Sequence, residues 1–366
     1  MNTTFFLFSY IKIVACHDKL INMYKFVKPL LFSLNPELAH DLTLSLLRYA
    51  GDLGIVKALM PPHIKDPVNL LGCEFPNRVG LSAGLDKNAS SVMGFAGLGF
   101  GFIEVGTVTP LPQNGNPKPR MFRINEYESI INRMGFNNNG LNALVDTLKK
   151  LRNNRLNIPI GINIGKNKNT PTSEAVNDYL TCLEGVAPYA DYISINLSSP
   201  NTPNLRDLQF GEPLEKLLIA LAQRRDELSE SLDKHIPLLV KVAPDMLRDD
   251  LLKVADQLVR QNIDGIIATN TTIDKSSINK HPLSFESGGL SGEVLFERST
   301  KIVSDLSSHL GDEIVIIGVG GINSPLHAVE KIKAGAHLVQ LYSGLIYQGP
   351  SLIRNSAREI KNILNK

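Results

Sequence analysis

Polar side chains stand where several apolar, strand-like segments end, and their types suggest ligand binding. Residues 192–203, YISINLSSPNTP, alternate aromatic or β-branched residues with small ones and then turn polar at Ser198 and Ser199. Asn is a poor strand former and a buried amide needs hydrogen-bond partners, so the end of this strand must meet something polar. The amides at such strand ends are Asn163, Asn196, Asn201 and Asn270. Each one could merely cap a helix, but the set fits recognition of a planar ligand rich in amide groups.

Two lysines, Lys87 and Lys241, follow or lie within apolar strands. An ammonium group is rarely placed there without an acidic partner or an anionic ligand. A structural ion pair and an anion-binding role are therefore both open for each lysine.

Two glycine-rich turns indicate a phosphate site. GVGGI at 318–322 and YSG at 342–344 follow the last two apolar runs of the chain. Glycine amides at such turns, together with a helix N-terminus, can face an anion. Glycine-rich turns also arise for steric reasons alone, but the two together predict a phosphorylated ligand.

Other chemistries have weaker support. The strand ends carry no cluster of His, Asp or Glu, and the eight histidines are scattered through loops and helices. This weakens metal-hydrolase and sugar-isomerase interpretations, which need metal ligands or a strong base. The candidate proton acceptor within SSPN, residues 198–201, is a hydroxyl. A net charge of +2 gives no sign of nucleic-acid binding, and the cysteines, which we interpret as reduced thiols without metal-binding spacing, are Cys16, Cys73 and Cys182.

The elements that position these groups repeat along the chain. Short runs rich in Val and Ile occur at 79–84, 102–108, 158–165, 192–198, 237–244, 265–272, 314–322 and 338–344. Segments of helical periodicity follow them at 88–98, 138–152, 173–188, 213–232, 248–262, 293–310, 325–335 and 350–364.

Near-continuous apolar strands that alternate with helices predict parallel strands buried on both faces. Eight such units are what a closed (β/α)8 TIM barrel needs, so we predict this α/β fold. A doubly wound open sheet is the structural alternative, but no GxGxxG motif opens the first unit. In a barrel the chemistry lies at the C-terminal ends of the strands, which is where the polar residues above fall.

These strand-end motifs resemble those of the dihydroorotate dehydrogenase family, specifically its membrane-associated, quinone-dependent class. The resemblance extends from residue 23 to the C-terminus. The matching motifs, in order, are AGLDKNA (83–89), GFIEVGTVTPLPQNGNPKPRMFR (101–123), INRMGFNNNG (131–140), GINIGKNKNTP (161–171), NLSSPNTPNLR (196–206), KVAPD (241–245), ATNTT (268–272), GGLSG (288–292), GVGGI (318–322) and YSG (342–344).

The resemblance implies oxidation of (S)-dihydroorotate to orotate in de novo pyrimidine biosynthesis. It implies FMN as hydride acceptor and a membrane quinone as final electron acceptor. From the composition and the strand ends described above, we expect neither a metal nor a nucleic-acid partner. By position it assigns the flavin and its phosphate to Ala83, Gly84, Thr107, Asn163, Asn196, Lys241, Thr269, Gly292, Gly321, Tyr342 and Ser343. It assigns the substrate to Lys87, Asn132, Arg133, Met134, Gly135, Phe136, Asn196, Asn201, Asn270 and Thr271.

Ser199 matches the catalytic base of the family, which removes a proton from C5 of the substrate while hydride leaves C6. A free serine hydroxyl is a weak base, and no histidine stands beside Ser199 in the sequence. The sequence does not show how it is activated; water with Thr202, and shielding by Phe136, are candidates. The soluble class of the family has cysteine at this position and lacks an N-terminal extension.

The N-terminal region divides into two segments ahead of the catalytic barrel, which we expect at 66–366. Residues 1–22 are apolar but interrupted by Lys12, fall short of a membrane span, and have no basic stretch typical of a secretory signal. They carry no family motif, so a chain starting at Met23 should keep its stability and quinone activity.

Residues 23–65 form the second segment, with two expected amphipathic helices at 24–34 and 36–50. Asn35 is the expected N-cap of the second helix and Pro36 its first residue. Lysines and arginines could face anionic headgroups while leucines lie against acyl chains, but the helices could also only plug the side of the barrel. The resemblance favours membrane docking at the cytoplasmic face of the inner membrane, with a quinone tunnel between the helices.

Three alternatives stay open on the residues alone. They are a soluble family member that uses fumarate or NAD, a flavin-free phosphosugar lyase or isomerase, and a catalytically silent barrel. Visible flavin absorption would exclude the flavin-free enzyme, and a comparison of quinone with fumarate would separate the two classes of the family.

Overall fold

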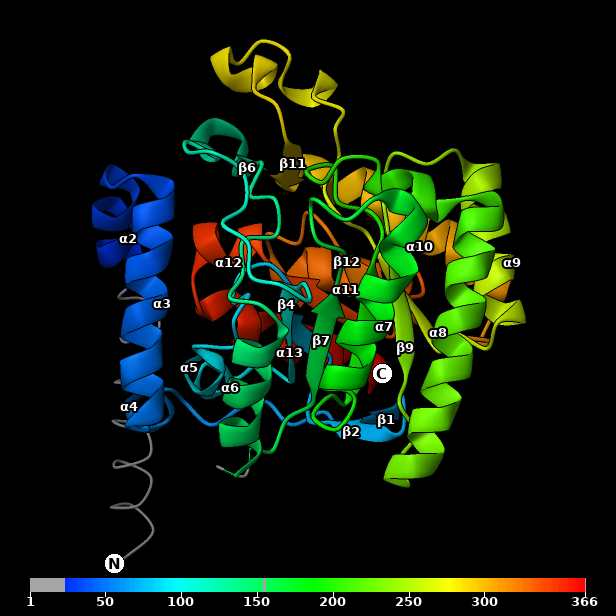
Figure 1. Cartoon of the computed structure of the whole chain (residues 1–366). Helices are drawn as coiled ribbons and strands as arrows, with labels where there is room; N and C mark the ends of the chain where they lie inside the picture. The colour runs from blue at the N-terminus through cyan, green and yellow to red at the C-terminus, as the bar shows by residue number, and fades with distance from the viewer. Residues whose placement is uncertain (1–23, 154–155, 366) are drawn as a thin grey trace, which may run out of the picture.

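The computed structural model describes residues 24–153 and 156–365. Predictions for residues 1–22, including the interpretation of Cys16, lie outside the described residues. Within the described part, eight parallel strands form a closed barrel surrounded by helices (Figure 1). The strands are β3 (Val79–Leu81), β4 (Phe102–Val108), β7 (Ile160–Ile164), β8 (Tyr192–Asn196), β9 (Leu238–Val242), β10 (Gly265–Ala268), β12 (Val315–Val319) and β13 (Leu338–Leu341). The TIM-barrel prediction and its eight strands are confirmed.

The barrel closes where the last strand meets the first. Val339 of β13 lies opposite Val79 of β3, and Leu341 lies opposite Leu81. Every residue of β4, β7, β8 and β9 is buried. This is why the strands read as near-continuous apolar runs rather than as alternating ones.

The helices of the outer ring are α5 (Val92–Gly97), α6 (Leu141–Asn153), α7 (Ala175–Val186), α8 (Gly211–Leu232), α9 (Arg248–Arg260), α10 (Phe296–Leu310), α11 (Pro325–Lys333), α12 (Ser343–Gln348) and α13 (Ser351–Leu364). Their apolar residues recur every three or four positions, which places one side of each helix on the barrel. In α6, for example, Leu141, Leu144, Leu148 and Leu151 are the buried residues. The helix expected at 88–98 begins only at Val92, because the Asp86 carboxylate accepts the backbone N–H groups of Ser90 and Ser91 and holds them in a turn.

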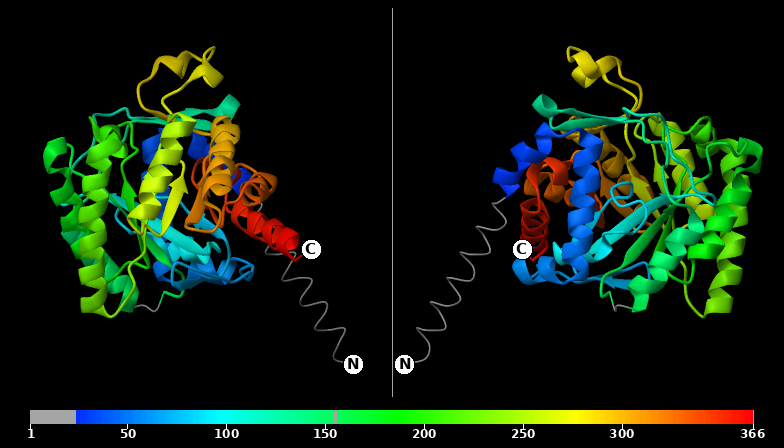
Figure 2. Two further views of the ribbon diagram at one scale, coloured as in Figure 1. Left: turned by 90° about the vertical axis from the view of Figure 1, so that its right-hand side faces the viewer. Right: turned by 60° about the vertical axis from the view of Figure 1, so that its left-hand side comes forward.

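Three helices precede the barrel: α2 (Tyr24–Ser33), α3 (Pro36–Asp52) and α4 (Ile55–Leu59). The predicted cap is confirmed, since the Asn35 side chain accepts hydrogen bonds from the backbone of Glu37 at 3.0 Å and Leu38 at 3.4 Å. Figure 2 shows α3 lying along the outside of the barrel, where it packs on α5. The Tyr24 hydroxyl of α2 donates to the Ile346 carbonyl of α12 at 2.5 Å. In the described residues, none of the helices combines the length and apolar character that a bilayer span requires.

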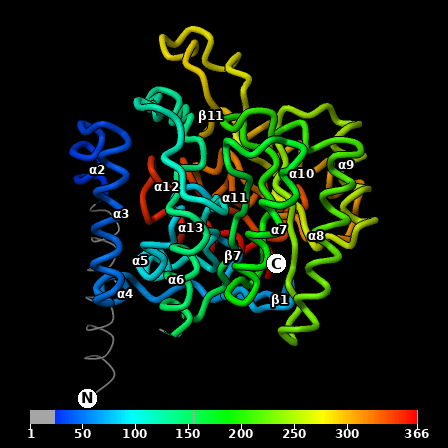
Figure 3. Tube along the Cα trace, in the orientation of Figure 1, coloured from blue at the N-terminus to red at the C-terminus, as the bar shows by residue number. Residues whose placement is uncertain are grey.

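Two antiparallel elements were not predicted. The hairpin of β1 (Val68–Leu70) and β2 (Cys73–Phe75) packs against the apolar interior of the barrel at the end opposite the strand C-termini (Figure 1). A three-stranded sheet joins β5 (Met121–Ile124), β6 (Ser129–Asn132) and β11 (Gly289–Gly292), with β6 in the centre. The chain between β10 and β11 rises above the barrel as an excursion that carries two short 3-10 helices, Ser276–Ile278 and Pro282–Phe285 (Figure 3).

Candidate active site

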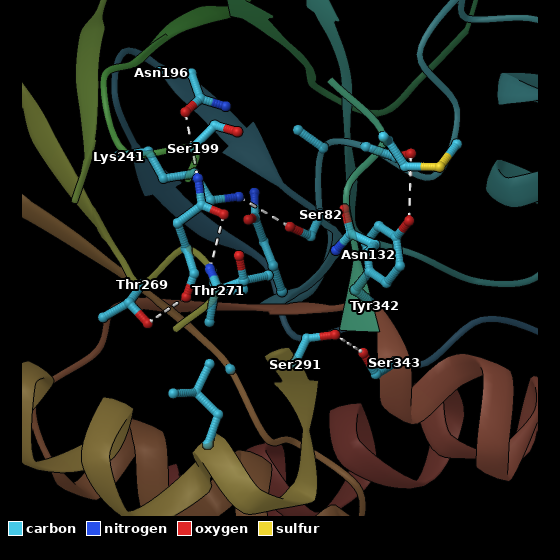
Figure 4. Close-up of a pocket in the computed structure, with 18 of the residues that line it drawn as sticks. Ser82, Asn132, Asn196, Ser199, Lys241, Thr269, Thr271, Ser291, Tyr342 and Ser343 are labelled. Carbon is cyan, nitrogen blue, oxygen red and sulfur yellow. Dashed lines mark hydrogen bonds between the residues drawn. The ribbon is translucent and has the colours of Figure 1, made fainter. Parts of the chain in front are cut away.

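A cavity with an empty volume of about 970 Å³, including the part open to solvent, lies at the C-terminal ends of the barrel strands. Strand ends from around the barrel and the strands β6 and β11 contribute to its wall (Figure 4). The predicted site residues that line it are Ala83, Gly84, Lys87, Thr107, Asn132, Met134, Gly135, Phe136, Asn196, Ser199, Asn201, Lys241, Thr269, Asn270, Thr271, Gly292, Gly321, Tyr342 and Ser343. Residues from nine separate stretches of sequence are therefore brought to one place, as barrel topology requires.

Two predicted site residues, Arg133 and Asn163, are not among the lining residues. The guanidinium of Arg133 pairs with Glu286 at 2.5 Å and lies over the ring of Phe122. Its sequence neighbours Asn132 and Met134 line the cavity, and successive side chains of an extended segment point to opposite sides. Arg133 therefore faces the excursion rather than the cavity.

Asn163 lies beneath the cavity floor, fully buried. Its Oδ1 accepts hydrogen bonds from Thr107 Oγ1 at 2.5 Å and from Asn196 Nδ2 at 3.1 Å. Its Nδ2 donates to Glu104 Oε1 at 2.9 Å and to Ser194 Oγ at 2.8 Å. Every polar atom of this amide is satisfied by protein, so Asn163 orients the lining residues Thr107 and Asn196.

Glu104 is a fully buried carboxylate at the centre of this network. It accepts hydrogen bonds from Asn163, from the Tyr192 hydroxyl at 3.0 Å and from Gln340 Nε2 at 2.6 Å. Gln340 lines the cavity, and its Oε1 is buried without a partner in the described residues. A buried acceptor of this kind needs a hydrogen-bond donor, which a ligand in the cavity or an ordered water can supply.

Lys241 reaches the cavity from β9 and is 5% exposed. Its ammonium donates to Ser82 Oγ at 3.2 Å, and within the described ranges it makes no ion pair. Burial lowers its pKa, an effect that the nearby Glu104 carboxylate opposes. Of the two alternatives open from the sequence, anion binding therefore has the better support for this lysine.

Lys87 lines the same cavity from the turn after β3. Burial, together with the guanidinium of Arg120, lowers the pKa of Lys87 to about 8, while Glu37 and Asp86 act in the opposite sense. The ammonium is thus poised to lose its proton in the mildly alkaline range unless an anion binds beside it.

Ser199 stands in the loop after β8 and is 6% exposed. Its Oγ accepts a hydrogen bond from the backbone N–H of Asn201 at 3.3 Å. The Asn201 side chain in turn donates to the backbone carbonyl of Asn132 at 3.1 Å, which ties this loop to β6. Phe136 lines the cavity and is almost fully buried, so the hydroxyl lies in a site with restricted access to water.

Asn270 holds the loops after β8 and β10 together. Its Nδ2 donates to Ser198 Oγ at 3.0 Å and to Asn196 Oδ1 at 3.3 Å. Its Oδ1 accepts the backbone N–H of Thr271 at 2.8 Å, whereas Thr271 Oγ1 is buried without a partner in the described residues. The polar side chains of this wall are preorganised, and one of them still has capacity for a ligand.

The two glycine-rich turns meet at one end of the cavity. Gly321 has φ of +73°, and a side chain there would place its Cβ 2.3 Å from the backbone of Phe296. A Cβ on Gly344 would lie 1.9 Å from the carbonyl oxygen of Ile322. Ser343 Oγ shares a hydrogen bond of 2.8 Å with Ser291 Oγ (Figure 4). Only glycine fits these positions, and bare backbone lines this end of the cavity, as phosphate binding requires.

Several lining residues were missed by the sequence analysis: Ser82, Ser291, Leu295, Val319, Gly320, Ile322, Gln340 and Gly344. Most of them lie within or beside motifs that had been recognised, so inclusion of motif neighbours would have found them. Gln340 and the underlying Glu104 carried a separate signal, because each is a polar residue within an apolar strand. In residues 24–153 and 156–365, no three His, Cys, Asp or Glu side chains are grouped in a way that could hold a metal ion.

Comparisons with known proteins agree with the motifs. The family model described as dihydroorotate dehydrogenase matches residues 67–364. A protein of Acinetobacter baylyi named dihydroorotate dehydrogenase (quinone) is 51% identical over 338 residues, which cover 92% of this chain and 99% of the relative. A protein of the same name from a Marinomonas species is 52% identical over 334 residues, covering 91% and 96% of the two chains. The crystal structure of DHODH from Eimeria tenella in complex with ferulenol superposes with a TM-score of 0.82 at 39% identity and covers 93% of this chain and 95% of that one.

Proposed function

Because the chain belongs to the dihydroorotate dehydrogenase family, we propose that the barrel cavity holds FMN and one pyrimidine substrate side by side. The reaction is the oxidation of dihydroorotate to orotate in pyrimidine biosynthesis, with a quinone as the electron acceptor. Family membership implies a flavin. The choice of FMN, the residue roles and the route of the quinone are the proposed parts.

Lys241 is the observation that carries the proposal of FMN. It is a buried cation without a carboxylate partner in the described residues, and it faces a cavity that ends in two glycine-rich turns. An anionic ring system with a phosphate would meet both features. When bound, FMN supplies a two-electron acceptor for the hydride that leaves C6 of the substrate.

The residues around that group have separate tasks. Lys241 would supply a fixed positive charge beside the flavin ring, and such a charge in a dry site is effective at short range. Thr107 and Asn196, oriented by Asn163, would contact the flavin ring. The turns at Gly321 and Ser343 hold the phosphate with backbone N–H groups.

The substrate-binding residues surround Ser199. Asn132, Asn201 and Asn270 offer amide donors and acceptors that match the edges of a pyrimidine ring. Lys87 attracts the substrate carboxylate. Ser199 takes the proton from C5 while Phe136 limits water, so the chain performs the proton transfer with a hydroxyl rather than with a metal or a histidine.

The quinone, we propose, reaches the flavin from α2 and α3. The outward side of α3 exposes Leu38, Leu42, Leu46 and Tyr49, and Leu53, the C-cap of the helix, is exposed as well. On α2, Phe26 is 81% exposed and Leu30 is 67% exposed. Such a face on paired helices is suited to the surface of a bilayer, which makes the chain a peripheral membrane protein, and we place it on the cytoplasmic face of the inner membrane.

A cluster of apolar side chains links these helices to the cavity. Phe32 of α2 packs edge-on against Tyr347 with ring centroids 5.4 Å apart. Tyr347 lies in the same cluster as Met121, Ile130 and Met134, and Met134 lines the cavity. This cluster is the route along which a quinone ring could approach the flavin. Residues 23–65 would then be the acceptor-entry segment and residues 66–366 the catalytic barrel.

Purification and a two-acceptor assay test the proposal. The protein should be yellow, release FMN on denaturation, and reduce a short-chain quinone when given dihydroorotate, with fumarate and NAD far poorer acceptors. A folded protein that stays colourless and takes up no FMN would exclude the flavin assignment. Faster turnover with fumarate would assign the chain to the soluble class instead.

A further inference from the structure

Arg206 connects the loops that follow three consecutive strands of the barrel. It lies in the 3-10 helix Leu205–Gln209, and its side chain is mostly buried. Its Nε donates to the Ser198 carbonyl at 3.1 Å, after β8, and its Nη2 donates to the Thr271 carbonyl at 3.1 Å, after β10. Its Nη1 pairs with Asp245 Oδ2 at 2.8 Å, after β9.

Ser198, the residue before Ser199, makes hydrogen bonds through its backbone N–H, its hydroxyl and its carbonyl. Its backbone N–H donates to Asn196 Oδ1 at 3.3 Å, and its hydroxyl accepts from Asn270 Nδ2 at 3.0 Å. Its carbonyl accepts from Arg206. Ser198 is fully buried, so no water can replace a lost partner without rearrangement. The backbone at Ser198 helps to place the Cα and Cβ atoms of Ser199, and one rotation, about the Cα–Cβ bond, then positions the hydroxyl oxygen.

Asp245 fixes the guanidinium in turn. Besides Arg206, it accepts hydrogen bonds from the Thr272 hydroxyl and from the backbone N–H of Ile273 at 3.1 Å. Arg298 also approaches this carboxylate at 3.4 Å, but its other contacts are Thr272 and Asp274. Arg206 and Arg298 therefore share Asp245, and only the contacts of Arg206 extend to the carbonyl beside Ser199.

We propose that Arg206, held by Asp245, is a positioning residue for the proton transfer from C5 of the substrate. It sets the distance between the Ser199 hydroxyl and the wall formed by Asn270 and Thr271, which is where the substrate ring binds. The inference rests on the proposed function. Displacement of a reacting group by about 1 Å can lower the rate about a hundredfold. A side chain that holds the Ser198 and Thr271 carbonyls can therefore strongly affect the rate of proton transfer.

The guanidinium is needed for its shape as well as for its charge. Its planar fork donates in three directions at once, to the Ser198 carbonyl, the Asp245 carboxylate and the Thr271 carbonyl. A lysine in its place has one compact ammonium at the end of a flexible stem and cannot reproduce that arrangement. Arg206→Lys should thus keep the charge and lose the positioning.

The test uses the holoenzyme with Arg206→Lys and Arg206→Gln, and with Arg298→Lys and Arg298→Gln as matched controls. Flavin reduction by dihydroorotate is followed in anaerobic single turnovers, and reoxidation by a short-chain quinone is followed separately. We expect both Arg206 variants to slow reduction roughly 10-fold to 100-fold, with reoxidation and FMN content within about twofold of the parent. The Arg298 variants should leave both half-reactions near the parent rates.

An isotope effect provides the readout that a purely structural role would not change. With substrate deuterated at C5, the isotope effect on flavin reduction should rise in Arg206→Lys, because proton removal becomes the slower part of the reaction. Equal slowing of both half-reactions, equal effects of the Arg206 and Arg298 variants, or an unchanged isotope effect would each overturn the proposal. If Arg206→Gln does not fold, the rates and the isotope effect of Arg206→Lys alone test the proposal. Failure of the proposed function would look different, since the parent protein itself would then lack FMN or dihydroorotate oxidation.

Discussion

At the scale of single residues, the task proposed for Ser199 is unusual for a hydroxyl that no histidine or carboxylate contacts in the described residues. Its recorded hydrogen bond comes from the backbone N–H of Asn201, which stabilises an oxygen that carries negative charge. The surrounding wall of Phe136 and the loop after β8 limits access by water. The position of the Ser199 hydroxyl and the exclusion of water therefore have to compensate for the low basicity of a hydroxyl.

Removal of this hydroxyl gives the first prediction. Ser199→Ala should bind FMN and orotate as the parent does and reduce its flavin about 10²-fold to 10⁴-fold more slowly, because only proton removal is lost. Anaerobic stopped-flow reduction by dihydroorotate measures the rate, and orotate titration measures the affinity. A reduction rate equal to that of the parent at neutral pH would transfer the role to another group, with Thr202 the next to be tested.

Lys241 leads to a prediction about charge. Lys241→Met keeps roughly the volume of the side chain and removes the ammonium, which leaves the buried Glu104 carboxylate without this nearby cation. Retention of FMN should weaken, or flavin reduction should slow, because negative charge on the reduced ring loses its nearest fixed cation. Flavin content after dialysis and the single-turnover rate are the two measurements. A variant that equals the parent in both would remove Lys241 from the flavin site.

The proposed contact of Lys87 with the substrate carboxylate predicts a pH dependence of orotate binding. Burial, with Arg120 nearby, lowers the pKa of this lysine to about 8 in the free protein. The ammonium form attracts the ligand carboxylate, so affinity is fully present below that pH and falls as the pH rises through it. The dissociation constant should increase by up to about tenfold per pH unit above the pKa, until the higher pKa of the complex is reached.

Orotate titrations between about pH 6 and about pH 9.5 measure this dependence. In Lys87→Met the affinity should be low throughout and nearly independent of pH. A parent protein whose affinity stays level across the range would show that Lys87 does not hold the carboxylate.

Side-chain direction limited what the sequence could predict about individual residues. Arg133 lies within a recognised motif between two lining residues, yet the alternation of an extended chain turns it toward Glu286. Asn163 lies at a strand end, but its place inside the barrel puts it under the floor, where Thr107 and Asn196 use it as an acceptor. A motif identifies the region, whereas the face of the strand decides whether a side chain touches a ligand.

At the scale of secondary-structure elements, α3 has two unlike faces. Its inner face is integrated into the barrel: the Glu37 carboxylate pairs with Arg120 at 2.7 Å, and a Cβ on Gly51 would lie 2.3 Å from Gly94 of α5. Its outer face is the exposed apolar line that includes Leu42 and Leu46. Removal of the whole segment before Asp66 would leave Arg120 without its carboxylate partner and uncover α5, so point substitutions on the outer face are the cleaner test.

Leu42→Glu combined with Leu46→Glu should detach the protein from vesicles that contain anionic lipid. Each leucine contributes roughly 1.5–3 kcal/mol when it is fully buried in an apolar phase, and the new carboxylates add repulsion, so binding should fall by more than about tenfold. Reoxidation by a long-chain quinone in vesicles should slow, while reduction by dihydroorotate should not. Co-sedimentation and the two half-reactions are the measurements.

The matched control is Leu247→Glu, an exposed leucine just before α9, which lies on the opposite side of the barrel from α3 (Figure 1). It should leave vesicle binding unchanged. Vesicle binding that survives the double substitution on α3 would show that this face only covers the barrel, which is the alternative left open by the sequence.

Periodicity predicted the parallel strands and outer helices but not the antiparallel sheet. The strands of the barrel are marked by Val and Ile runs that are buried on both faces. By contrast, β5, β6 and β11 are strands of four residues each, and β11, Gly289–Gly292, contains two glycines. Such short segments have no clear period, and the pairing of β6 with β11 depends on residues about 160 positions apart, as in Leu290 opposite Ile131.

At the scale of the whole molecule, the fold was predictable because each βα unit repeats the same local pattern. The cavity was predictable only in outline. The arrangement of its lining side chains depends on contacts between βα units, such as the hydrogen bond from Gln340 of β13 to Glu104 of β4. No local sequence pattern specifies such contacts. The contacts of Arg206 are of the same kind, since they join loops that follow β8, β9 and β10.

The closure of the barrel between β3 and β13 also constrains how the protein is made. Val79 and Val339 are partners in the register, so the seam forms only when nearly the whole chain has left the ribosome. Until then, β3 presents an unpaired edge that can recruit other chains, and pairings of this sequence separation are slow to form. The cavity is assembled across that seam, because Lys87 follows β3 and Tyr342 follows β13. A flavin must therefore be captured after translation, and its binding free energy then adds to the stability of the closed barrel.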